Sequence, residues 1–222
     1  MVVARDTWAH GPGRDGEERA FVTTSNLPGR KPVRPPEDRL PPGQRLTDGW
    51  PVLTYGSTPR IDLATWEFRI FGLVEEEVRL DWDEFNALPQ SEDTSDIHCV
   101  TTWSRYDNHW RGVRFTDVMA LAKVLPEAKE VMFHSYGGYT TNVPLDELLH
   151  EGVLLAHTHD GQPIDRDHGG PLRGVVPQLY FWKSAKWVRG IEFLPEVRPG
   201  FWEMYGYHIH GDPWKEQRYS YQ

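Results

Sequence analysis

The sequence His168-Gly-Gly-Pro-Leu-Arg-Gly-Val-Val-Pro177 is followed, after two residues, by Tyr180-Phe-Trp-Lys-Ser-Ala-Lys186. Glycines allow a ligand to approach the backbone closely. Arg173, Lys183 and Lys186 gather positive charge here, although the chain as a whole carries a net charge of −9. Arginine and lysine are side chains well suited to binding phosphate groups. The stretch would suit a phosphorylated cofactor, and it would equally suit a Gly/Pro turn with solvated basic side chains.

The only cysteine of the 222-residue chain lies in Asp96-Ile-His-Cys-Val-Thr-Thr-Trp-Ser104, at the end of a strand predicted for residues 97–102. Strand ends and the loops after them present reactive groups from a rigid scaffold. The Cys99 thiolate is a soft donor that suits a soft or high-valent metal, whereas a cysteine without such a role packs in the core. A single cysteine also excludes an internal disulfide, which is typical of a reducing compartment.

Two His-x-His pairs, His157-Thr-His159 and His208-Ile-His210, offer an alternative metal site. Residues i and i+2 of a strand point to one face, so His157 with His159, or His208 with His210, could bind zinc. The spacing fixes no third ligand, and exposed or hydrogen-bonded histidines explain the pairs better.

The composition narrows the class of protein. The mean hydropathy is −0.61, and no apolar run approaches the roughly 20 residues that a membrane helix needs. The first residues do not join a basic segment to an apolar stretch, as a secretory signal does. We therefore expect a cytoplasmic protein without membrane insertion, and the net charge of −9 argues against nucleic acid as a partner.

Residues 1–50 are expected to form an extended arm that packs on the domain, because residues 29–43 are rich in proline, which lacks an N–H and restricts its predecessor. Residues 51–222 are expected to form the domain. The sequence pattern predicts strands at 66–71, 77–82, 130–134, 139–143, 152–156 and 186–194. Helices are predicted at 81–88, at 115–123 with Thr116 or Asp117 as its cap, and at 144–150. Short strands and helices that interleave without a βαβ period predict an α+β fold with a mixed sheet.

Several stretches, in order along the chain, resemble the molybdopterin-binding domain of the sulfite oxidase superfamily. Residues 98–104 with Trp110-Arg-Gly-Val113 resemble the segment that carries the cysteine ligand of molybdenum. Residues 152–177 and Lys183-Ser-Ala-Lys-Trp187 resemble the longest signature of the family, and Phe21-Val-Thr-Thr-Ser-Asn-Leu-Pro28 resembles its N-terminal segment. The resemblance covers about residues 20–195, and the tail after Phe201 looks like that of small stand-alone bacterial members.

The resemblance implies a set of site residues. Cys99 would be the thiolate on molybdenum, beside the two dithiolene sulfurs of molybdopterin. The residues that would bind the cofactor, the last three as a phosphate cradle, are Asn26, Ser135, His168, Arg173, Ser184, Ala185 and Lys186. The fold implied is the α+β, mixed-sheet fold of this superfamily.

The sequence also departs from sulfite oxidases. His157 stands where they carry a substrate tyrosine, and Thr24 and Ser104 stand where they carry arginines. Because sulfite is a dianion, losing this positive lining weakens the case for sulfite as substrate. His157, His98 or Arg105 could replace part of the charge. His157 is also the candidate for a substrate-side acid or base, since an unperturbed histidine titrates near pH 6.5, and equally a plain residue of the pocket wall.

The resemblance therefore predicts a molybdenum–molybdopterin oxidoreductase that transfers an oxygen atom to or from a small substrate, such as an S-oxide, an N-oxide or a sulfite-like anion. The sequence has no stretch for a haem domain or an immunoglobulin-like dimerisation domain, so electrons are expected to pass to or from a separate carrier. Two alternatives stay open: a non-catalytic pterin-binding protein, and a zinc protein that uses His157, His159, His208 or His210.

Overall fold

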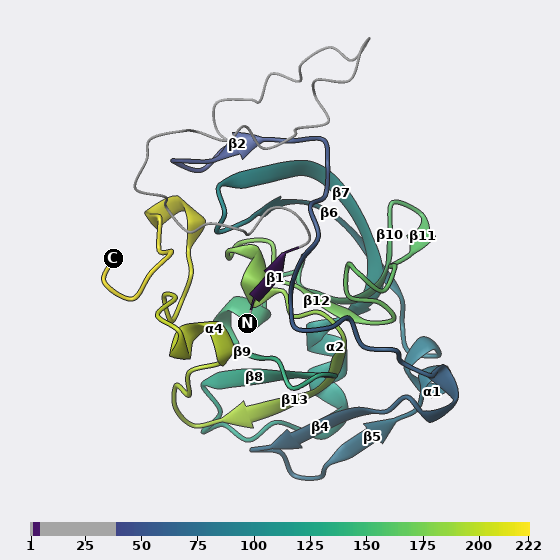
Figure 1. The fold of residues 1–222 in the computed structure, drawn as a ribbon. Helices are drawn as coiled ribbons and strands as arrows, with labels where there is room; N and C mark the ends of the chain where they lie inside the picture. The colour runs from purple at the N-terminus through teal and green to yellow at the C-terminus, as the bar shows by residue number, and fades with distance from the viewer. Residues whose placement is uncertain (1, 5–38) are drawn as a thin grey trace.

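A computed structural model of the chain describes residues 2–4 and 39–222. Its helices are short and its strands are many (Figure 1). The strands are β1 (Val2–Ala4), β2 (Arg45–Leu46), β3 (Leu53–Tyr55), β4 (Phe68–Gly72), β5 (Val78–Leu80), β6 (Ser91–His98), β7 (Trp103–Arg114), β8 (Glu130–Ser135), β9 (Thr140–Pro144), β10 (Leu154–His159), β11 (Gln162–Pro163), β12 (Arg173–Val175) and β13 (Val188–Leu194). The helices are α1 (Trp82–Asn86), α2 (Phe115–Ala122), α3 (Leu145–Leu148) and α4 (Phe201–Met204), with 3₁₀ turns η2 (Leu63–Thr65), η3 (Phe181–Lys183) and η4 (Pro213–Lys215).

The strands form two larger sheets and one small pair. One sheet runs in the order β11-β10-β7-β2, with β6 also on β7 and β12 also on β10, and the other runs β5-β4-β13-β8-β9. Most neighbours are antiparallel, but β2 with β7 and β4 with β13 are parallel. The predicted α+β fold with mixed sheets is therefore confirmed.

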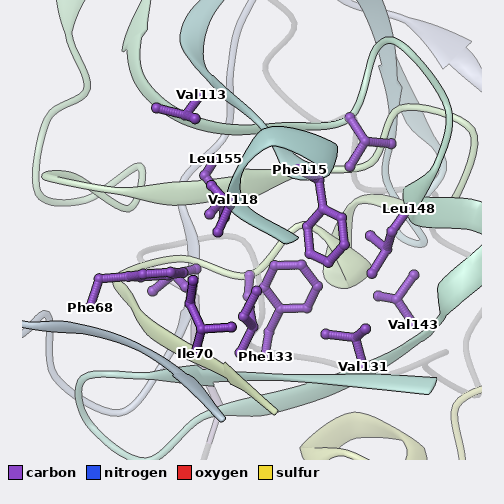
Figure 2. Close-up of a cluster of buried hydrophobic side chains, with 14 of the residues drawn as sticks. Phe68, Ile70, Val113, Phe115, Val118, Val131, Phe133, Val143, Leu148 and Leu155 are labelled. Carbon is purple, nitrogen blue, oxygen red and sulfur yellow. The ribbon is translucent and has the colours of Figure 1, made fainter. Parts of the chain in front are cut away.

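A core of aliphatic and aromatic side chains fills the space between the two larger sheets (Figure 2). Phe68 and Ile70 alternate inward from β4, Phe133 does so from β8, and α2 contributes Phe115 and Val118. All five are at most 1% exposed, and burial of such a side chain contributes about 1.5–3 kcal/mol relative to exposure. This core holds the two larger sheets together, and the site residues lie on these sheets and on the loops that connect their strands.

Several of the strands and helices predicted from the sequence are confirmed, but some of their boundaries and caps differ. The strands at 66–71 and 186–194 correspond to β4 and β13, and a capping box between Asp81 and Glu84 starts α1. The strand predicted at 97–102 is confirmed only for Ile97 and His98, because β6 ends at His98 and a turn follows. The predicted cap of α2 is wrong, since Arg114 occupies the cap position without a side-chain hydrogen bond.

The predicted arm, residues 1–50, is described only in part. Within it, Val2–Ala4 pair with β3, and Arg45–Leu46 pair in parallel with β7. None of the helices formed by the described residues has the length and apolar character that a membrane crossing requires.

Candidate cofactor and substrate site

A cavity opens beside the turn between β6 and β7 and holds about 890 Å³ of space, including its open mouth. Its wall is largely aromatic, and few polar groups reach it. The aromatic residues are Trp50, Tyr55, Trp103, Tyr139, Phe181, Trp182, Trp187, Trp202 and Tyr207, and the polar ones include Cys99, Thr101, His168, Arg173, Ser184 and Lys186. A mainly apolar pocket with a few convergent polar groups is the usual form of a ligand site.

Cys99 is held in this wall by the turn that follows β6. Its N–H donates to the Trp103 carbonyl (2.8 Å) and its carbonyl accepts from the Thr102 N–H (3.0 Å), with Thr102 in the left-handed region at φ 73°. The thiol is 3.1 Å from the Thr101 hydroxyl. Burial raises the pKa of the Cys99 thiol, while the Thr101 contact and the charges of Arg218 and Lys186 oppose that shift. A bound cation would favour the thiolate further.

Buried polar side chains support the Cys99 turn from behind. Gln44 donates to the Cys99 carbonyl (3.1 Å) and accepts from the Ser104 hydroxyl (3.3 Å), which is 2.8 Å from Nδ1 of His98. Burial lowers the pKa of His98 to about 4, despite the opposing charge of Asp96. His98 is also not among the residues that line the cavity.

Arg173 and Lys186 give the cavity its positive charge. Arg173, on β12, donates to the carbonyls of His168 (2.6 Å) and Ser184 (3.0 Å), and Lys186 donates to the carbonyl of Asp167 (2.6 Å). Burial lowers the pKa of Arg173 to about 9 and, together with the charge of Arg173, lowers that of Lys186 to about 7.

No carboxylate of the described residues forms an ion pair within 4 Å of either cation, but the charge of Asp165 and, for Lys186, that of Asp167 favour the charged forms over longer distances. Burial nevertheless outweighs these charges and lowers both pKa values, so an anion in the cavity would stabilise Arg173 and Lys186 in their charged forms. A metal that binds thiolate and a phosphate that binds these two cations fit this donor set.

His168 is fixed at the edge of the cavity. Its Nδ1 is 2.7 Å from the Asp165 carboxylate, its Nε2 is 3.0 Å from the Trp50 carbonyl, and its ring lies 4.1 Å from the Trp50 ring centroid. These contacts, and the bond that Arg173 donates to the His168 carbonyl, hold His168 beside Arg173.

The other predicted cofactor residues differ in their positions. Ser184 reaches the wall, but its hydroxyl already accepts from the Val176 N–H (3.0 Å). The Ser184 and Ala185 N–H groups each make a local 3.2 Å bond. Ser135, at the end of β8, is buried away from the cavity wall, with no described partner for its hydroxyl. Asn26 lies outside the described residues.

Lys183 does not join the other two cations. Its Nζ is fully buried, 2.6 Å from the Glu203 carboxylate, and donates to the carbonyls of Asn142 (2.8 Å) and Ile209 (2.6 Å). The charge cluster inferred from the sequence is thus confirmed for Arg173 and Lys186 and wrong for Lys183, whose role is to anchor α4.

His157 and Arg105 lie away from the cavity. A β-bulge at His157 interrupts the pairing of β10 with β7, and its ring nitrogens face Gln90 (2.7 Å) and Thr158 (2.9 Å). Arg105 forms an ion pair with Asp160 (2.7 Å). The structure does not bring either predicted catalytic residue to Cys99.

We expect His157→Gln to change turnover by about twofold or less, because the amide can keep the contact with Gln90 and the ring does not reach the cavity. Steady-state kinetics of the metal-loaded protein measure this. A loss of tenfold or more would return His157 to the reaction as an acid or base.

The histidine pairs do not form a metal site within the described residues. The bulge at His157 breaks the alternation that would direct His157 and His159 to one face. His208 accepts from the His210 N–H (3.0 Å) and His210 faces Glu147 (2.9 Å). No group of three or more His, Cys, Asp or Glu side chains in this part of the chain is placed to bind a metal.

Three residues of the site were not predicted from the sequence. Gln44 and Arg218 donate to the turn that carries Cys99, and Tyr207 lines the cavity. Arg218 reaches the Val100 carbonyl across 118 positions of the chain, a separation that no local pattern reveals. The aromatic residues of the tail were the only available signal for Tyr207.

Comparison with known proteins finds relatives over most of the chain. The family model described as "Oxidoreductase molybdopterin binding domain" matches residues 55–202. The uncharacterized oxidoreductase YuiH of Bacillus subtilis (strain 168) is 50% identical over 82% of this chain and 93% of its own. A putative protein-methionine-sulfoxide reductase subunit, YedZ1 of Azospira oryzae, is 28% identical over 77% of this chain and 66% of its own.

Among solved structures, the sulfane dehydrogenase SoxCD of Paracoccus pantotrophus has a similar fold. The TM-score is 0.60 at 20% identity, over 65% of this chain and 42% of that one. The fold similarity and the family match together confirm the resemblance drawn from the sequence. The chain belongs to the family of oxidoreductases with a molybdopterin-binding domain, of the sulfite oxidase type.

Proposed function

We propose that this oxidoreductase holds a molybdenum–molybdopterin cofactor through Cys99 and transfers an oxygen atom to or from a small substrate. The observation that carries the proposal is the meeting, in one aromatic cavity, of the only thiol of the sequence with two buried cations, Arg173 and Lys186. The single cysteine supports a reducing compartment such as the cytoplasm. Electrons would pass to or from a separate carrier protein.

Each part of the cavity has a physical task in this proposal. Cys99 supplies the metal ligand, and Arg173 and Lys186 neutralise the phosphate of the pterin. His168 is held by Asp165 and Trp50 and contacts the pterin. The aromatic wall limits the access of water, which strengthens the charge interactions inside. When bound, the cofactor supplies the two-electron oxygen-transfer chemistry, while the protein binds and orients.

The cavity favours neutral substrates over sulfite. Apart from the cations assigned to the phosphate, the described wall offers His168 as its only other basic side chain. Arg105 is turned to Asp160. An S-oxide or N-oxide is uncharged overall and suits aromatic surroundings. The name of the Azospira relative, a putative protein-methionine-sulfoxide reductase subunit, supports S-oxides as the first class to test.

The proposal is tested by elemental analysis of protein made in a host that synthesises molybdopterin. Molybdenum close to one atom per chain, with zinc near background, is the expected result. Dye-linked reduction of several S-oxides and N-oxides then separates an enzyme from a non-catalytic pterin-binding protein. A folded protein without molybdenum would overturn the proposal, and stoichiometric zinc in its place would favour the histidine alternative.

Anion binding by protein prepared without the cofactor should weaken as the pH rises. Sulfate stays doubly charged between about pH 6 and about pH 8, whereas Lys186, with a pKa of about 7, loses most of its charge over that interval. Arg173 keeps most of its charge over the same interval, since its pKa is about 9. Isothermal titration with sulfate measures the effect, and in Lys186→Met the binding should be weaker at low pH and less dependent on pH. If the wild type bound sulfate with equal affinity at about pH 6 and about pH 8, a role for Lys186 in anion binding would be contradicted.

A further inference from the structure

The C-terminal tail completes the cavity. The family match ends at residue 202, yet the chain continues past α4 and returns to the wall that holds Cys99. Arg218 donates to the carbonyls of Val100 (3.0 Å) and Pro42 (3.3 Å), which ties the tail to the Cys99 turn. Tyr207, from the same tail, lines the cavity itself. In Figure 1 the tail is the yellow segment after α4.

The ring of Tyr207 is held on several sides. It stacks on Trp202 with centroids 5.0 Å apart and planes at 19°, and it meets the edge of Trp182 at 5.1 Å and of Tyr219 at 5.8 Å. The backbone N–H of Tyr207 also donates to the Trp202 carbonyl (3.0 Å). A ring restrained in this way presents its hydroxyl in a fixed direction, with little entropy left to lose on binding.

The hydroxyl of Tyr207 differs from most other hydroxyls of the wall. Tyr139 donates to the Trp182 carbonyl (2.7 Å), Thr101 contacts Cys99 (3.1 Å), and Ser184 accepts from Val176 (3.0 Å). No hydrogen bond joins the Tyr207 hydroxyl to any described residue, and this oxygen is not among the fully buried unpaired atoms. Because Tyr207 lines the cavity, its O–H is a donor without a described acceptor beside the space that a substrate would fill.

We propose that Tyr207 is a substrate-binding residue, whose O–H donates a hydrogen bond to the oxygen of an S-oxide or N-oxide in the cavity. The proposal rests on the oxygen-transfer function proposed above and names the group that orients its substrate. A phenol donates well to the polarised oxygen of such a group, and the surrounding Trp182 and Trp202 suit its alkyl substituents. Burial raises the pKa of Tyr207 above its ordinary value, so the phenol keeps its proton at neutral pH.

The test compares Tyr207→Phe with Tyr205→Phe in the metal-loaded protein. Phe keeps the ring packing and removes only the hydroxyl, and Tyr205 is a tail tyrosine that is 66% exposed and outside the cavity wall. Binding of dimethyl sulfoxide is followed by the fluorescence of the cavity tryptophans, and turnover is measured in parallel. We expect Tyr207→Phe to raise Kd and KM by about tenfold, the effect of one lost hydrogen bond to a polar ligand, and Tyr205→Phe to change neither.

A second variant, Tyr207→His, keeps a ring N–H donor and is expected to recover part of the affinity. Equal binding by wild type and Tyr207→Phe, or no saturable binding by the wild type, would overturn the role of Tyr207. The binding comparison also separates the two proposals. If the wild type is molybdenum-free or inactive but still binds dimethyl sulfoxide more tightly than Tyr207→Phe does, the oxygen-transfer function is refuted and the binding role stands.

Discussion

Cys99→Ala is expected to abolish turnover and to lose most of the bound molybdenum. Alanine has no donor atom, and the groups that interact with the Cys99 thiol are the Thr101 hydroxyl and the cations Arg218 and Lys186, which are poor ligands for this metal. Loss of an outer-shell partner of a metal ligand already lowers metal affinity or activity by about 10–100-fold, so loss of the ligand should exceed that. Molybdenum per chain and S-oxide reduction, measured on the same preparations, give the two readouts.

Cys99→Ser is the matched control for this experiment. Serine keeps the size of the side chain and a hydrogen bond to Thr101, but its hydroxyl does not ionise near neutral pH. Both variants should keep the circular dichroism spectrum of the wild type, because the turn is held by backbone bonds and by Gln44 and Arg218. Wild-type turnover in Cys99→Ala would refute the proposed role of the thiol as metal ligand.

Elements whose structure depends on neighbouring residues could be predicted from the sequence. Asp81 and Glu84 form the capping box that starts α1, and the alternation at residues 130–143 corresponds to the hairpin of β8 and β9. The longest strand, β7, was missed. It carries exposed polar residues and is a central strand, paired with β6, β10 and β2, so its stability comes from strand pairing that a search for apolar runs does not detect.

The site also combines features that the local sequence predicts with features that depend on distant parts of the fold. Cys99, Arg173 and Lys186 were identified because their chemistry is unusual for an acidic chain with one thiol. The direction in which a side chain points depends on more distant features. One extra residue in β10 turns His157 towards Gln90, and a carboxylate from another element turns Lys183 away from the cavity. Residue type predicted what the site contains, while the sheet and the tail decided which residues reach it.

Lys183→Met should lower the free energy of unfolding by about 3–5 kcal/mol, the usual effect of removing one partner of a buried ion pair. Methionine has a similar volume, so the main loss is electrostatic. The carboxylate of Glu203 would keep Trp182 (2.9 Å) and Thr141 (3.1 Å) as donors but lose its counter-charge. Because whole domains are stable by only about 5–15 kcal/mol, urea unfolding should show the change clearly.

Two further variants test whether the buried charge is the cause. Lys183→Met with Glu203→Gln removes both charges and keeps an acceptor for Trp182, so it should be more stable than Lys183→Met alone. Lys215→Met removes the exposed partner of Asp212 and should change stability by less than about 1 kcal/mol. Since Glu203 lies on α4, just before Tyr207, Lys183→Met should also weaken substrate binding, and the double variant should restore part of it. If the double variant is no more stable than the single one, packing rather than charge anchors the tail to the cavity.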